Sequence, residues 1–202
     1  MTQFGELSNW KSIAKNWWFS LLLLPFIGYH IHQAHWVLNY NIFFSISYSF
    51  PFPVNLEKFL MTHFLLIVHE AGHTFFSIFG NRILTILGGS LNEILFSLII
   101  LGYFLLNQTP KGVQAGLYLL GSAWFSIAFY AADAGKRQLP LIGDLGPESH
   151  DWHNLLRHWN LLEYDHQIAT AFVMFGIACY AAAIVLPLFM KTYEQVNLDL
   201  SL

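Results

Sequence analysis

The sequence predicts an all-α protein, a polytopic membrane helix bundle of about five transmembrane helices. Hydrophobic residues make up 55% of the 202 residues and charged residues only 10%, well below the roughly 25% that is usual in soluble domains. Five apolar stretches reach about 20 residues, the length that a helix needs to cross a bilayer. Aromatic residues make up 17% of the chain and several lie near the ends of these stretches, as they do at membrane interfaces.

The five stretches form one predicted transmembrane domain that covers residues 1–202. The predicted spans are 17–40, 59–80, 83–106, 112–132 and 168–190. Two connections between them are long. Pro51 and Pro53 prevent a continuous helix through the first, residues 41–58. The second, residues 133–167, carries most of the polar residues and is the predicted metal-site loop.

The distribution of lysine and arginine predicts the orientation of the chain in the membrane. Cytoplasmic loops carry an excess of these residues, and one side of the predicted bundle carries twice as many as the other. We therefore expect a multi-pass integral membrane protein in the lipid bilayer with a cytoplasmic N-terminus. The predicted cytoplasmic residues are Lys11, Lys15, Arg82, Lys136, Arg137 and Arg157, and those opposite are Lys58, Lys111 and Lys191.

Charge and cysteine content exclude two further properties. The net charge is −3 and there is no basic run, so nucleic acid is not an expected partner. Cys179 is the only cysteine, which excludes an intrachain disulfide. The oligomeric state stays open.

The second predicted span contains the stretch HEAGH, which places His69, Glu70 and His73 among apolar residues. Ionisable groups at bilayer depth are costly, which favours a functional role over a polar patch satisfied by bonds between helices. The two histidines are four residues apart, so on a helix they share one face and can bind one metal ion. In zinc enzymes with this motif the imidazoles bind Zn²⁺ and the glutamate is the general base. We predict the same roles here.

A catalytic zinc ion needs a third protein ligand, with the fourth position left for water. The predicted loop 133–167 lies on the same side of the membrane as HEAGH, and we expect the ligand to come from it. Asp151 is the first choice because a helix-like run, WHNLLRHWNLL, follows it directly. His150 is second, followed by His153 and Asp144. The alternative interpretation of His150 and Asp151 is a helix N-cap in a solvated loop.

The run from HEAGH to NEILFSLII resembles the site-two protease family of intramembrane zinc metalloproteases, over residues 67–101. The resemblance implies hydrolysis of a peptide bond in or near a transmembrane segment of a substrate membrane protein, by water that the metal activates. It also implies that Asn92 holds the substrate backbone. The family's third ligand is the aspartate of an Asp-Gly motif, which this sequence lacks. We therefore expect a divergent, minimal member.

The third predicted span has its own polar and small residues. Glu93 is expected to be protonated, to pair with a histidine such as His63, or to hydrogen-bond a zinc-bound imidazole. Gly88 and Gly89 are expected either to break the helix and admit a substrate strand or to allow close helix packing.

Two alternative functions follow from the remaining histidines and from the metal site itself. The stretch HIHQAH, with His30, His32 and His35, adds a third histidine cluster of the kind found in membrane di-iron desaturases and hydroxylases. Those sites usually need about eight histidines with paired H-H elements, which are missing here, so a polar face near the interface is the preferred interpretation. The second alternative is a non-catalytic zinc-binding membrane protein.

Overall fold

The computed structural model describes residues 3–39 and 50–189, and within these residues it contains helices and no strand. The all-α prediction is therefore confirmed. The long helices are α1 (Gln3–Asn39), α3 (Val54–Ser77), α4 (Arg82–Leu106), α5 (Pro110–Ala132) and α7 (Asp165–Val185), with a short helix α6 (Asp151–His158) and the 3-10 turns η1 (Ile142–Asp144), η2 (Pro147–Ser149), η3 (Leu162–Tyr164) and η4 (Leu186–Leu188).

Three helical segments are long and apolar enough to cross a membrane: α4, α5 and the segment Leu162–Leu188, which contains α7. They support a membrane protein and three of the five predicted spans. Helices α1 and α3 also coincide with predicted spans, although residues 40 and 190 lie outside the described residues. Their histidines and glutamates lower their mean hydropathy, so the spans at α1 and α3 stay predictions.

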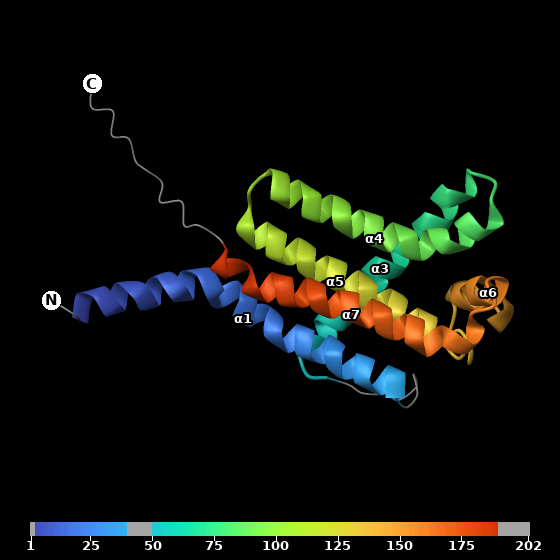
Figure 1. Cartoon of the computed structure of the whole chain (residues 1–202), viewed down its shortest axis with the longest axis horizontal. Coiled ribbons are helices and arrows are strands. Elements are labelled where there is room, and N and C mark those ends of the chain that lie inside the picture. Colours follow the sequence, from blue (N-terminus) through green and yellow to red (C-terminus); the bar gives the residue numbers. More distant parts are fainter. Residues whose placement is uncertain (1–2, 40–49, 190–202) are drawn as a thin grey trace, which may run out of the picture.

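Helix α5 is the central element of the bundle (Figure 1). It packs along α7 on one side and α4 on the other, while α1 lies against α5 and α7. Helix α3 packs chiefly on α4 and crosses the other helices obliquely toward the end of the bundle that carries α6. Because α3 makes little contact with α1, the two helices leave a space between them over one face of α5.

The interface of α5 with α7 is an apolar core built from aromatic rings. Phe125 and Tyr180 are buried and stack with their centroids 5.2 Å apart. Each ring lies where a glycine on the opposite helix leaves room: a Cβ on Gly121 would meet Tyr180, and one on Gly176 would meet Phe125. The two small residues therefore let large rings interlock between helices.

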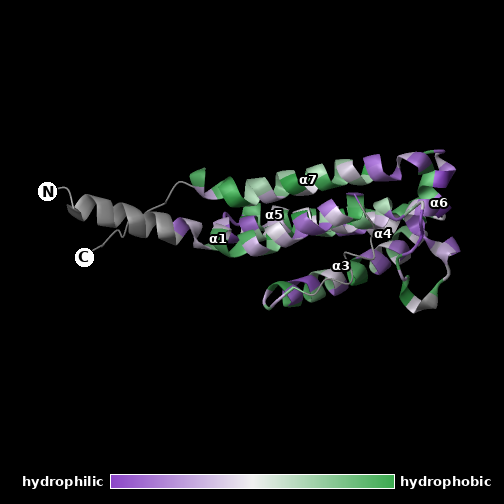
Figure 2. Ribbon diagram, turned by 90° about the horizontal axis from the view of Figure 1, so that it is seen from below, coloured by the Kyte–Doolittle hydropathy of each residue, from purple (hydrophilic) through white to green (hydrophobic). Residues whose placement is uncertain are grey.

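The outward faces of the bundle are apolar. Ile99 on α4 is 70% exposed and Met174 on α7 is 60% exposed, which agrees with helix faces that contact lipid. Polar residues gather instead at the end of the bundle where α6 lies (Figure 2). The polar end is also where the predicted metal-site loop folds back onto the helices.

Candidate metal centre

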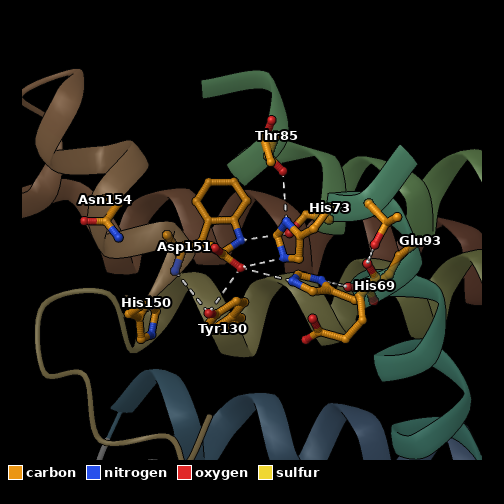
Figure 3. A network of polar contacts seen from close by, with 12 residues as sticks. His69, His73, Thr85, Glu93, Tyr130, His150, Asp151 and Asn154 are labelled. Carbon is orange, nitrogen blue, oxygen red and sulfur yellow. Dashed lines mark hydrogen bonds and ion pairs between the residues drawn. The ribbon is translucent and has the colours of Figure 1, made fainter. Parts of the chain in front are cut away.

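The structure brings together His69, His73 and Asp151, the two histidines of HEAGH and the first choice for a third ligand. Each offers one ligand atom, and the three atoms lie within 4.8 Å of one another. The Nε2 atoms of both imidazoles lie 3.1 Å from the same carboxylate oxygen, Oδ2 of Asp151. Figure 3 shows the imidazoles of α3 and the aspartate at the start of α6 pointing toward one another.

Both imidazoles are oriented by a partner on α4. The Nδ1–H of His73 donates to the backbone carbonyl of Thr85 at 2.8 Å, and Nδ1 of His69 lies 2.8 Å from Oε1 of Glu93 (Figure 3). Because a carbonyl only accepts, the contact with Thr85 places a proton on Nδ1 of His73. In both imidazoles Nδ1 faces α4 and Nε2 faces Asp151. A carboxylate or backbone carbonyl behind a metal-binding histidine commonly plays this part.

The three ligand atoms lie close enough together to share one metal ion. In a neutral imidazole with its proton on Nδ1, Nε2 carries a lone pair that would repel the lone pairs of Asp151 at 3.1 Å. A proton on each Nε2 or one cation between the three atoms removes this repulsion. Neighbouring ligands of a tetrahedral zinc ion lie about 3.3–3.6 Å apart, given bonds of about 2.0–2.2 Å. The donor set of two imidazoles and one carboxylate is also typical of zinc.

The helix α4 makes room for the site with glycines rather than with a break. It runs as a helix through Gly88 and Gly89, so these residues allow close packing and do not interrupt the backbone. A Cβ on Gly89 would collide with the imidazole of His69, and a Cβ on Gly72 would collide with the carbonyl oxygen of Gly88. The glycine of HEAGH and the Gly-Gly element of α4 therefore bring α3 and α4 close enough to seat His69.

Asp151 is held by the docking of α6 onto the bundle. Trp152 and Leu156 are buried in a core cluster with residues of α5 and α7, and the Nε1–H of Trp152 donates to Ser90 Oγ on α4 at 3.1 Å. The phenol of Tyr130 on α5 donates to Oδ2 of Asp151 at 3.3 Å and accepts from its backbone N–H at 3.1 Å. The carboxylate of Asp151 at the start of α6 is thus contacted from α3 and α5, while α4, α5 and α7 hold α6 in place through Trp152 and Leu156.

The carboxyl group of Asp151 is an anion in this environment. Burial raises its pKa, but hydrogen bonds with His69 and His73 outweigh that effect and bring the pKa down to about 2.

Of the other predicted ligands, His150 and His153 lie outside the metal group. His150 is the N-cap of α6, where its Nδ1 accepts from the backbone N–H of His153 at 3.2 Å, and its Nε2 lies 3.3 Å from Asp133 Oδ2. His153 is buried, with Nδ1 2.8 Å from the carbonyl oxygen of Ala134. The side chain of Asp144 lies outside the described part of the chain. The N-cap interpretation therefore applies to His150, while Asp151 joins the metal group.

Glu70 lines the same cavity as the metal group. The cavity has a volume of about 730 Å³ and lies between α1 and α3, over α5 and beneath residues 139–145 of the loop. Glu70, His69, His73 and Asp151 all contribute to its wall. The carboxylate predicted to act as general base and the three predicted ligands therefore open onto one space.

Two further predicted residues have specific partners. Asn92 Nδ2 donates to the backbone carbonyl of Val68 at 2.7 Å, so its amide joins α4 to α3, and its predicted contact with substrate stays a prediction. Glu93 is 2% exposed and pairs with His69 rather than with His63, whose Nδ1 bonds to the carbonyl of Phe59 in its own helix.

The histidines of HIHQAH lie on α1, apart from the metal group. His30 Nε2 is 3.4 Å from Glu57 Oε1. His32 Nε2 accepts from Trp36 Nε1, and His35 contacts Asn39. Among the described residues the only group of three or more metal-binding side chains is His69, His73 and Asp151, which is far fewer than the eight ligands of a di-iron membrane enzyme.

Comparison with models of protein families, with curated proteins and with solved structures finds no match to this chain.

Three residues that shape the site have little signal in the sequence. Tyr130 lies in an apolar stretch rich in aromatic residues, so its position near Asp151 has no local signature. Asp133 follows α5 directly and accepts from the backbone N–H groups of Gln138 and Leu139, which fixes the start of the loop. The only sign of this role in the sequence is that Asp133 is an acidic residue directly after a predicted span. Trp152 gives its signal only through the amphipathic pattern of α6.

Proposed function

We propose that this protein is an intramembrane zinc metalloprotease that hydrolyses a peptide bond in or near a transmembrane segment of another membrane protein. The observation that carries the proposal is the convergence of His69, His73 and Asp151, with Glu70 on the wall of the same cavity. The proposal includes five spans in the lipid bilayer, a cytoplasmic N-terminus and a role for Asn92 in holding substrate backbone.

In this proposal each polar side chain has a defined part. His69, His73 and Asp151 hold Zn²⁺, which when bound supplies a Lewis acid that polarises a carbonyl and makes water more acidic. Glu70 takes a proton from the attacking water on a carboxylate oxygen and gives it to the amine that leaves. Glu93 and the carbonyl of Thr85 keep the Nδ1 protons in place, which fixes the imidazoles.

The cavity supports a reaction on a buried substrate because its wall combines apolar and polar groups. Leu65, Leu66 and Phe129 offer an apolar surface, while Glu70 and Tyr130 stand near the metal group. A peptide segment that leaves its helical form in a membrane needs protein around its backbone. A cavity lined by α1, α3 and α5 supports such cover.

The first test is the metal content of the detergent-purified protein, measured by elemental mass spectrometry. We expect about one zinc per chain in the wild type, and almost none in His69→Ala or Asp151→Ala. His63→Ala is the matched control, because His63 lies on the same helix, is exposed and bonds to the carbonyl of Phe59 in that helix. Two irons per chain would favour a di-iron oxidoreductase, and no metal would contradict the proposal.

The second test separates catalysis from metal binding. Single-span test proteins with labelled ends, reconstituted in vesicles with the wild type, should yield cleaved products. Glu70→Gln should keep its zinc and lose cleavage by at least about 100-fold, since a general base contributes roughly that much. If the wild type and Glu70→Gln both bind zinc and neither cleaves the test proteins, the protein is instead a non-catalytic zinc-binding protein.

A further inference from the structure

One face of α3 lines the cavity over most of the length of the helix. The residues of α3 in the cavity wall follow one another at alternating intervals of three and one, which places them on a single broad face. They are Lys58, Met61, Thr62, Leu65, Leu66, His69, Glu70 and His73. Lys58 precedes His69 by about three turns, so the two side chains project in nearly the same direction about 16 Å apart, and His73 lies about 22 Å from Lys58 along the helix. Lys58 and the metal group therefore occupy separate positions on one wall.

Lys58 is a cation of the cavity wall that has no anionic partner in the described part of the chain. Its ammonium group lies 5.9 Å from the centre of the Tyr29 ring on α1, and Tyr29 lines the cavity as well. The ion pairs among the described residues all involve a histidine, and none involves Lys58. The neighbouring Glu57 is directed elsewhere, since its Oε1 accepts from Tyr118 at 2.6 Å and lies 3.4 Å from His30. The described residues therefore leave the charge of Lys58 without a counter-charge.

The charged side chains of the cavity wall are distributed unevenly. Among the described residues that line the cavity, Lys58 is the only lysine or arginine, and the acidic residues are Glu70, Glu93 and Asp151. All three acidic residues belong to the region of the metal group: Glu70 follows His69 in the chain, and the other two contact its imidazole. Binding sites usually combine an apolar wall with a few charged or polar groups that decide which ligand is accepted. Lys58 is therefore available to bind an anionic group of a ligand, at a distance from the metal group.

We propose that Lys58 selects the substrate by binding the carboxylate of an aspartate or glutamate in the segment that is cut. This inference rests on the proposed function and names the substrate class of the same site. A peptide bond can be attacked only where the segment has left its helical form, and an extended chain advances about 3.3 Å per residue. The separation of about 16–22 Å between Lys58 and the two histidines then corresponds to about five to seven residues. The substrates are transmembrane segments with an acidic residue at that distance from the cleaved bond.

The first test measures binding and does not require catalysis. Fluorescent single-span peptides that carry either one glutamate or one glutamine at the same position are titrated with the detergent-purified Glu70→Gln protein, and fluorescence anisotropy gives the affinity. The position of the glutamate is varied along the segment. We expect the best glutamate peptide to bind at least about tenfold more tightly than its glutamine counterpart, because a hydrogen bond between charged groups contributes at least this much.

Substitutions of Lys58 show whether this residue causes the preference. Lys58→Met should abolish it, Lys58→Arg should keep it, and Lys58→Glu should replace it with a preference for a lysine peptide. Lys136→Met is the matched control, because Lys136 is exposed and lies outside the cavity wall. Equal binding of the glutamate and glutamine peptides, or a preference that survives Lys58→Met, would overturn the proposal.

Cross-linking measures the spacing. A photoreactive phenylalanine is placed about six or about twelve residues from the glutamate, and mass spectrometry identifies the residues of the Glu70→Gln protein that it labels. We expect the nearer position to label residues beside the metal group, such as Thr85 and Tyr130, which contact His73 and Asp151. Labelling of these residues from the farther position alone would overturn the extended spacing.

The same peptides separate this inference from the proposed function. A wild-type protein that prefers the glutamate peptides through Lys58 but cleaves none of them would contradict the protease and support the binding site. Cleavage that is equally fast for glutamate and glutamine peptides would support the protease and overturn the role of Lys58.

Discussion

The interfaces of α5 with α7 and of α3 with α4 use the same device for different ends. Both bring helices together at glycines. At α5 and α7 the room left by Gly121 is filled by the ring of Tyr180, so close approach produces an apolar core. At α3 and α4 the room left by Gly89 is filled by the imidazole of His69, which Glu93 then orients. A glycine in a membrane helix can thus stabilise the fold or position a functional group, and the residue that it faces decides which.

The sharpest test of this difference is Gly89→Ala. The added Cβ would meet the imidazole of His69, which must then move away from Asp151. We expect the affinity for zinc to fall by about 100-fold or more, because a first ligand is displaced and not merely loosened. Titration with zinc against a competing chelator measures this loss. Unchanged affinity would show that Gly89 is not needed to seat His69.

Gly121→Ala is the counterpart in the other interface. Its Cβ would meet the ring of Tyr180, and overpacking of this kind costs about 1–3 kcal/mol of stability. We expect a lower thermal unfolding temperature in detergent, followed by tryptophan fluorescence, with the zinc affinity of the folded protein unchanged. A loss of zinc affinity equal to that of Gly89→Ala would mean that the two interfaces are not separable.

Glu93→Gln probes the partner of His69 without changing the size of the side chain. The amide oxygen can still accept from Nδ1, but the side chain can no longer carry a negative charge beside the imidazole. We expect the zinc affinity to fall between about 10-fold and 100-fold, as is typical for partners of this kind. The competition titration reports the change, and a wild-type affinity would assign Glu93 to packing alone.

Among the substitutions around the metal group, Tyr130→Phe should have the smallest effect on zinc affinity. It removes one hydrogen bond to Asp151 Oδ2 and one from the backbone of Asp151, while the docking of Trp152 on Ser90 remains. We expect zinc affinity to fall about 10-fold, at the lower end of the usual range for such partners. A loss as large as that of Asp151→Ala would indicate that the phenol itself is a ligand.

The local parts of this structure could be predicted from the sequence. Apolar stretches of about 20 residues locate the helices, and the spacing of four between His69 and His73 places both on one face. Asp151 could be ranked first because a helix-like run follows it. These inferences depend on residues close together in the chain, where periodicity constrains geometry.

The long-range contacts could not be predicted. The sequence left several possible partners for Glu93. Its contact with His69 depends on how closely Gly72 and Gly88 let α3 approach α4. The contact of Tyr130 with Asp151 depends on where α6 docks. The role of His150 could be proposed either way, and its pairing with Asp133 across the base of the loop decides it. Such contacts are set by tertiary packing and not by pattern.

The position of Asp151 in the chain has a mechanical consequence. It lies 82 residues after His69, so a metal ion held by both is a reversible cross-link that closes a long loop through α4 and α5. A ligand that binds only the folded state adds stability in proportion to the logarithm of its concentration, about 1.4 kcal/mol for each tenfold excess over Kd. The metal concentration would then set how stably α6 is docked on the bundle. In a cell with little metal, α6 would detach more often, and proteases would reach the chain more easily there.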